Sequence, residues 1–144
     1  MKETKRKINY RNDFCPKAEI IAALYKEASL NRPNDDLDRI TRMYKDSNIV
    51  ITAWDGDRLV GILRGWTDKA YDGYVCDLAI QPEYQKAGIG KELLNQAISN
   101  NPKVQFVLRA SVIAGDYYKH LGWQKIENGW VFPRENKQSS SALV

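Results

Sequence analysis

Cysteine and histidine, the residues most often found in disulfide frameworks and zinc sites, are scarce in this sequence. Its 144 residues include two cysteines, Cys15 and Cys76, and a single histidine, His120. Two cysteines in a chain of this length do not make a disulfide framework, and structural zinc sites need four ligands. We therefore expect two free thiols and no bound metal.

Long apolar runs are missing as well. No stretch approaches the roughly 20 consecutive apolar residues that are needed to cross a bilayer. The first ten residues, MKETKRKINY, are basic but contain no apolar segment of the kind found in secretory signals. These two absences predict a cytoplasmic protein that does not enter a membrane.

The charge balance is moderately basic. The net charge is +4 and the pI is about 9.0. A basic surface attracts polyanions, which include nucleic acids and phosphorylated small molecules. Part of the excess comes from four basic residues at positions 2–7, and no nucleic-acid-binding motif accompanies the charge. We therefore expect no nucleic-acid partner.

Hydrophobic periodicity and turn residues divide the chain into helices and strands. The expected helices cover residues 16–30, 35–47, 88–100 and 114–122. The expected strands cover residues 5–11, 48–54, 58–66, 73–80, 103–110, 123–127 and 130–134, with hairpin turns at Asp55-Gly56 and Asn128-Gly129. This order predicts a mixed α/β domain at residues 1–135, followed by a polar, disordered tail at 136–144.

The segment from Asp77 to Leu94 carries the main chemical signal. An apolar strand leads through a short loop into a helix that starts near Gly88. The first turn of a helix has unpaired backbone N–H groups and the positive end of the helix dipole, which suits a phosphate. Glycines at 88 and 90 remove side chains where a pyrophosphate must approach the backbone.

Two common phosphate-binding motifs do not match this segment. A P-loop requires GxxxxGK[ST], but Glu92 follows Lys91, and Gln85 stands at the position of the first glycine. A Rossmann fingerprint requires GxGxxG, and Leu93 occupies its third glycine position. Without further context, the two glycines indicate only a tightly packed helix start.

Further blocks supply that context, because they resemble the Gcn5-related N-acetyltransferase (GNAT) superfamily. QKAGIG at 85–90 resembles the signature Q/R-x-x-G-x-G/A, and IQPEY at 80–84 resembles its usual entry. AGDYYKHLGW at 114–123 resembles the family block A-x-x-F-Y-x-x-x-G-F, and LVG at 59–61 resembles a family strand. The resemblance spans about residues 5–134. It implies the GNAT fold, a mixed and mostly antiparallel twisted sheet with splayed central strands, flanked by helices.

The resemblance also implies acetyl-CoA as the cosubstrate. In the family, the pantetheine arm pairs with the signature strand, which here corresponds to Leu78, Ala79 and Ile80. The pyrophosphate contacts the following turn, which here comprises Gln85, Lys86, Ala87, Gly88, Ile89, Gly90 and Lys91. Ser111 stands where many members have a cofactor-contacting asparagine. Tyr118 matches the tyrosine that contacts the cofactor and protonates the departing thiolate.

The general base has no motif match. Some family members carry a glutamate near the start of the signature strand, where this sequence has Tyr74. Asp77 is the nearest carboxylate, and a carboxylate in an apolar strand needs a partner or solvent. Two interpretations stay open: Asp77 is the base, or it pairs structurally with Arg64. A water chain is a further route for the proton, and His120 is expected at the surface.

The acceptor amine is not identified by the sequence. Trp66, Asp68, Tyr71 and Asp72 lie near the expected acceptor cleft, and residues 64–78 resemble a subgroup that includes aralkylamine acetyltransferases. We expect an N-acetyltransferase that acetylates a primary amine of a small molecule or peptide by direct attack in a ternary complex. The alternative is a non-catalytic acyl-CoA-binding sensor or regulatory module. Whether the chain is a monomer or a homodimer stays open.

Overall fold

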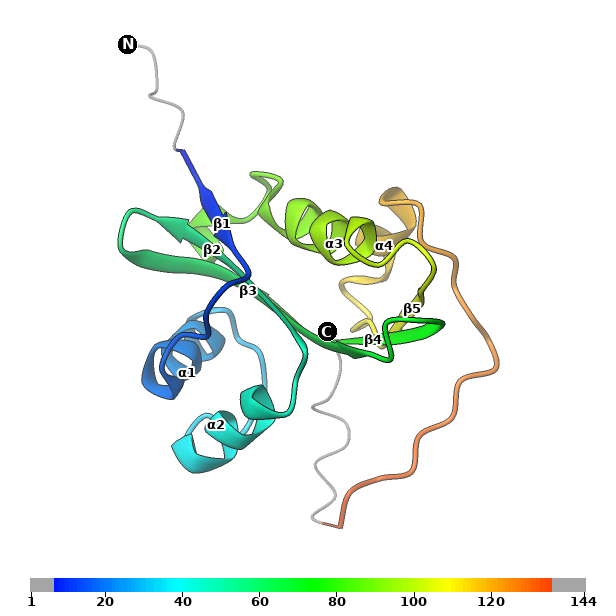
Figure 1. Cartoon of the computed structure of the whole chain (residues 1–144), viewed down its shortest axis with the longest axis horizontal. Helices are drawn as coiled ribbons and strands as arrows, with labels where there is room; N and C mark the ends of the chain where they lie inside the picture. Colours follow the sequence, from blue (N-terminus) through cyan, green and yellow to red (C-terminus); the bar gives the residue numbers. More distant parts are fainter. Residues whose placement is uncertain (1–6, 136–144) are drawn as a thin grey trace.

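The computed structural model describes residues 7–135, in which five strands form one sheet in the order β1-β2-β3-β4-β5 (Figure 1). The strands are β1 (Asn9–Arg11), β2 (Ile49–Asp55), β3 (Arg58–Thr67), β4 (Asp72–Ile80) and β5 (Gln105–Leu108). The helices are α1 (Ala18–Glu27), α2 (Leu37–Lys45), α3 (Ile89–Ser99) and α4 (Gly115–His120), with a short 3-10 helix, η1 (Pro82–Tyr84). The predicted tail at 136–144 lies outside the described residues.

The sheet is mixed and mostly antiparallel. Strands β1 to β4 pair antiparallel with their neighbours, whereas β5 pairs parallel with β4. The β2–β3 hairpin turns at Gly56, whose φ of 59° suits a residue without a Cβ. A parallel neighbour requires a crossover connection, which α3 supplies between β4 and β5. The expected fold class is confirmed.

Helices cover both faces of the sheet (Figure 1). Helices α1 and α2 cover one face, and the core on this side contains Ile21, Leu24, Tyr25, Ile40, Tyr44, Leu59, Ile62 and Ala79. Helix α3 covers the other face, with α4 beside it, and this core contains Ile51, Val60, Leu63, Val75, Ile89, Leu93, Leu94 and Tyr118. No helix within residues 7–135 is long and apolar enough to span a bilayer.

A bulge interrupts the pairing of β3 with β4. Arg64 pairs with Asp77 and Gly65 pairs with Val75, so Cys76 is an extra residue on β4. Because side chains alternate between the two faces of a strand, one extra residue reverses the alternation that follows it. Val75 therefore lies in the core beneath α3, whereas Asp77 faces the core beneath α1 and α2.

The structure contradicts two of the predicted strands, 123–127 and 130–134. Residues 123–135 contain no strand, and beyond Trp123, which packs against the core, the segment runs clear of the sheet (Figure 1). A strand is stabilised by hydrogen bonds to a neighbouring strand, and this segment has no such neighbour in the described part of the chain. Composition and the Asn128-Gly129 turn signal were therefore insufficient to predict strands here.

Candidate active site

Strands β4 and β5 separate halfway along β4. Their pairing ends at Val75 and Leu108, while β3 stays paired with β4 up to Ile80. On the β5 side, the backbone of residues 76–80 therefore has no partner strand within the described chain. An open strand edge of this kind can bind an extended ligand through its peptide groups. The residues expected to pair with pantetheine lie on this edge: Leu78, Ala79 and Ile80.

The chain that follows β4 forms an exposed turn before α3. Residues 85–88 are exposed, and Lys86 and Gly88 adopt positive φ angles of 65° and 82°. Helix α3 then begins at Ile89, close to the predicted start. A Cβ on Gly88 would meet no heavy atom within 4 Å, so space lies open beside this first turn. The exposed start of this 11-residue helix fits a pyrophosphate.

Two residues tie this turn to its surroundings. The side-chain amide of Gln85 donates a hydrogen bond to the carbonyl oxygen of Ile80 at 3.4 Å, which links the turn to the end of the open β4 edge. Gly90 is buried against Tyr117, because a Cβ at Gly90 would lie 2.6 Å from the Tyr117 hydroxyl oxygen. Of the other predicted turn residues, Lys86, Ala87 and Lys91 are exposed and Ile89 is in the core.

Helix α4 contributes two adjacent tyrosines to this region. Tyr118 is 6% exposed, and its ring packs edge-on against those of Tyr117 and Trp123. Burial raises the pKa of Tyr118, so its phenol stays protonated at neutral pH and can donate a proton or hydrogen bond. The hydroxyl of Ser111 accepts a hydrogen bond from the backbone N–H of Ala114 at 3.3 Å, where α4 starts.

Asp77 is fully buried at the centre of a charged network. Arg32 Nε donates to its Oδ1 at 2.6 Å, and Arg64 Nε donates to its Oδ2 at 2.5 Å. The Tyr25 hydroxyl also donates to Oδ2, at 2.8 Å, and forms a hydrogen bond with the Tyr44 hydroxyl. Burial would raise the pKa of Asp77, but the charges of Arg64 and Arg32 outweigh it and hold the pKa below its ordinary value.

These contacts favour the structural interpretation of Asp77 over the general-base interpretation. A base must reach the proton that it removes, whereas both carboxylate oxygens of Asp77 already accept hydrogen bonds in the core. Arg32 belongs to the α1–α2 connection and also donates to the carbonyl oxygen of Cys76 at 3.1 Å. The contacts of Arg32 with Asp77 and Cys76 thus hold the α1–α2 connection against the bulge in β4.

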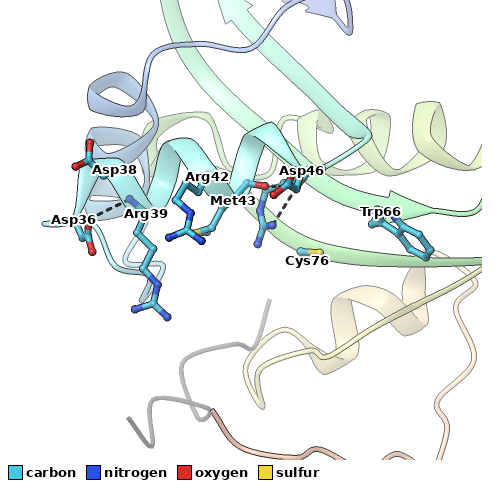
Figure 2. Close-up of a pocket in the computed structure, with 10 residues that line it drawn as sticks. Asp36, Asp38, Arg39, Arg42, Met43, Asp46, Trp66 and Cys76 are labelled. Atoms are coloured by element: carbon cyan, nitrogen blue, oxygen red, sulfur yellow. Dashed lines mark hydrogen bonds between the residues drawn. The ribbon is translucent and has the colours of Figure 1, made fainter. Parts of the chain in front are cut away.

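A groove of about 620 Å³ opens between α2 and the two central strands (Figure 2). Its lining residues are Asp36, Asp38, Arg39, Arg42, Met43, Asp46, Ser47, Arg64, Trp66 and Cys76. Figure 2 shows the charged residues along α2, with Trp66 at the far end of the row. Cys76 stands where the open edge of β4 begins, so the groove reaches the point at which β4 and β5 separate.

Sequence reasoning missed several of these residues. Tyr117 lies against Gly90 in the turn before α3. The only signal in the sequence that could have identified Tyr117 is its place beside Tyr118 in the family block. Arg32 contacts Asp77 across 45 positions, which no local pattern reveals. Of the aromatic and acidic residues expected near the acceptor, Trp66 lines the groove. Asp68, by contrast, accepts hydrogen bonds from backbone amides of its own loop. No group of three potential metal ligands occurs within residues 7–135.

Sequence comparison identifies relatives with the same type of domain. The acetyltransferase (GNAT) domain matches residues 21–132. An uncharacterized N-acetyltransferase, ycf52, from Pyropia yezoensis is 27% identical over 100 residues, which cover 65% of this chain and 58% of that protein. The chloroplastic GCN5-related N-acetyltransferase 2 of Arabidopsis thaliana is 29% identical over 75 residues, 50% of this chain and 29% of that protein. The chain thus spans only part of the length of these curated relatives.

Solved structures share the fold. A probable acetyltransferase from methicillin-resistant Staphylococcus aureus gives a TM-score of 0.76 at 21% identity, covering 89% of this chain and 99% of that one. A GNAT-family acetyltransferase from Streptococcus pneumoniae gives 0.71 at 23% identity, covering 90% and 100%. At such identities the likeness concerns the fold alone, whereas the domain match covers most of the sequence. With that match, the open β4 edge and the glycine turn before α3, the chain belongs to the GNAT acetyltransferase family.

Proposed function

We propose that the chain is an acetyl-CoA-dependent N-acetyltransferase that transfers an acetyl group to a primary amine. The observation that carries the proposal is the open edge of β4 at residues 76–80, which leads to the exposed turn before α3. One continuous stretch thus offers peptide groups for an extended, amide-containing arm and helix amides for a pyrophosphate. Coenzyme A carries both groups in one molecule.

The binding residues follow from this placement. Leu78, Ala79 and Ile80 would pair with the pantetheine arm, and residues 85–91 would hold the pyrophosphate. Lys86 and Lys91 are exposed at this turn, where their charges favour phosphate binding. We also propose Ser111 as a cofactor contact. In the structure its hydroxyl accepts a hydrogen bond from the backbone N–H of Ala114, within its own loop.

Acetyl-CoA supplies a thioester whose acyl carbon is attacked by the amine and whose sulfur leaves as a thiolate. We propose Tyr118 as the proton donor to this thiolate, since its raised pKa keeps the phenol protonated. A backbone N–H near Ile80 is the proposed donor to the developing oxyanion. The transfer is direct, so the amine and the coenzyme are bound together in a ternary complex.

We place the acceptor amine in the groove that reaches Cys76. Trp66, half exposed, offers an aromatic wall, and Asp46 offers a carboxylate to a cationic amine. This lining suits an amine of a small molecule or a peptide. A lysine-like amine with a pKa of ~10.4 must lose a proton before it attacks. Because Asp77 is held in ion pairs, we propose that solvent in the groove accepts this proton.

Release of coenzyme A thiol from acetyl-CoA, measured over a panel of primary amines, tests the proposal. The panel contains an arylalkyl amine, a polyamine, a lysine peptide and a peptide with a free N-terminus, each paired with its N-acetylated form as the control. A Cys15→Ser background removes the exposed protein thiol from the signal. We expect at least one free amine, and none of the acetylated controls, to raise thiol release above the amine-free rate.

A non-catalytic acyl-CoA-binding module is the second candidate function. The specific observation in its favour is Asp77, because its ion pairs leave no free carboxylate on β4 beyond Asp72. Binding of acetyl-CoA without amine-stimulated thiol release anywhere in the panel would support this module and contradict the enzyme. Turnover with any amine would exclude it.

A further inference from the structure

Two arginines of α2 line the groove without an ion-pair partner. Arg39 and Arg42 are exposed, and neither guanidinium group forms an ion pair with any residue of the described chain. The third arginine of the groove is different, because Arg64 pairs with Asp77 and its Nη1 donates to the Ser47 hydroxyl at 3.2 Å. The groove therefore contains two guanidinium groups that are available to a ligand.

These two guanidinium groups lie on one side of the helix. Residues three positions apart are neighbours on a helix surface. Figure 2 shows both arginine side chains extending below α2, whereas the Asp38 carboxylate lies above it. Asp36, at the start of α2, accepts a hydrogen bond from the backbone N–H of Arg39 at 3.1 Å. Because a guanidinium group presents a planar fork of donors that matches a carboxylate, this pair suits an anionic group of a ligand.

The other end of the groove carries a carboxylate. Asp46 ends α2, and the next residue, Ser47, accepts a hydrogen bond from Arg64, which pairs with Asp77 beside the bulge in β4. At a rise of 1.5 Å per residue, Arg42 and Arg39 precede Asp46 by roughly 6 and 10 Å along the helix axis. The guanidinium groups thus lie farther from the proposed point of acetyl transfer than the carboxylate does.

We propose that the acceptor amine also carries a carboxylate, which Arg39 and Arg42 bind while the amino group lies toward Asp46 and Cys76. This acceptor class rests on the proposed N-acetyltransferase function. An acceptor with both signs of charge matches a groove with both signs of charge. Met43, also in the lining, supplies apolar surface for the carbon chain between the two groups.

The same charges disfavour two other classes of acceptor. A diamine would place its second ammonium group against two guanidinium groups, and like charges repel. A phosphate would bring close to two negative charges into a groove that is also lined by Asp36, Asp38 and Asp46. A single carboxylate therefore fits the lining better than either group.

Pairs of acceptors that differ only in the anionic group test the inference by turnover. Thiol release is measured with 4-aminobutanoate, 6-aminohexanoate and 8-aminooctanoate, each compared with its carboxamide. The products are one N-acetylated acceptor and one coenzyme A thiol per turnover. We expect kcat/KM to be at least about tenfold higher for the acid than for the carboxamide in the pair of best-fitting length, as for a charge-assisted hydrogen bond.

Replacing Arg39 and Arg42 together by glutamine should bring this acid-to-carboxamide ratio to about one. The matched control replaces Lys45 and Lys103 together by glutamine. This control removes the same two positive charges, but both lysines are exposed and lie outside the lining of the groove. It should keep the preference of the wild type for the acid.

Binding of the same probes separates failure of this inference from failure of the proposed function. The nitrogen-15-labelled protein is titrated with each acid and carboxamide, without and with coenzyme A, and the amide signals of α2 and Cys76 report the Kd. We expect at least one acid to bind about tenfold more tightly than its carboxamide.

Tighter binding of the acid at α2, without thiol release from any amine, would contradict the proposed enzyme but support the carboxylate site. Equal Kd values for each acid and its carboxamide would overturn the inference, even in an enzyme that acetylates other amines. A preference for the acid that survives in the double arginine variant would also overturn it.

Discussion

Replacing Asp77 with asparagine is expected to lower the free energy of unfolding by about 3–5 kcal/mol. The substitution keeps the side-chain volume but removes the negative charge between Arg32 and Arg64, whose side chains are 7% and 15% exposed. Two largely buried guanidinium groups then lose their ion pair with this carboxylate. Urea denaturation at pH 7 measures the change. Asp46→Asn, at an exposed carboxylate of the groove, is the matched control and should change stability by less than about 0.5 kcal/mol.

The pH dependence of this stability has a defined sign. The native pKa of Asp77 lies below its ordinary value, so the unfolded chain binds this proton more readily than the native chain. The network therefore stabilises the fold fully above the ordinary pKa of about 3.9, and this contribution is lost as the pH falls through the native pKa. The stability difference between wild type and Asp77→Asn should stay constant between about pH 5 and 8, and shrink in stronger acid.

The same variant separates the two interpretations of Asp77. If Asp77 were the general base, Asp77→Asn would keep its unfolding free energy, lose kcat/KM for the amine and change the acidic limb of the pH–rate profile. That combination would contradict the structural role. A destabilised Asp77→Asn variant whose remaining folded fraction keeps the pH–rate profile of the wild type would support the structural role.

Replacing Tyr118 with phenylalanine is expected to lower kcat by about 10²–10⁴-fold, while the Kd for acetyl-CoA stays unchanged. The phenol is proposed to act only as the thiolate leaves, and phenylalanine keeps the ring contacts with Trp123 and Tyr117. Steady-state kinetics with the best amine of the panel, combined with calorimetry of acetyl-CoA, measure the two quantities separately.

Tyr117→Phe is the matched control for this substitution. Tyr117 is the neighbouring tyrosine of the same helix, is 40% exposed, and approaches Gly90 rather than the core. It should keep the rate of the chemical step. Full turnover of Tyr118→Phe, with chemistry shown to limit the rate, would remove Tyr118 from the mechanism. Loss of kcat in Tyr117→Phe alone would assign the donor to Tyr117.

Features that depend on neighbouring residues could be predicted from the sequence. Gly88 precedes a helix and Gly56 forms a hairpin turn, and both have positive φ angles that glycine adopts without steric cost. The separation of β4 from β5 followed from the family resemblance and not from residue patterns. The pairing of Asp77 with Arg64 was one of two open interpretations, because adjacent strands bring these residues together.

Features that depend on distant residues could not be predicted in this way. Arg32 reaches Asp77 from a connection 45 positions away, and its role depends on how α1 and α2 pack on the sheet. The prediction of two C-terminal strands was wrong for a related reason. Residues 123–134 have strand propensity, but a strand also requires an available edge, and local sequence carries no information on where that edge lies.

Calorimetric titration of acetyl-CoA into the wild type and Gly88→Glu tests whether the turn before α3 binds the coenzyme. We expect saturable binding by the wild type and loss of binding by Gly88→Glu, because the new carboxylate enters the open space proposed for the pyrophosphate. Gly56→Glu, at a glycine with a similar positive φ and open surroundings in the β2–β3 hairpin, controls for backbone strain and should bind normally. A wild type that does not bind acetyl-CoA would contradict the proposed cosubstrate, and a folded Gly88→Glu variant with unchanged affinity would contradict the proposed pyrophosphate site.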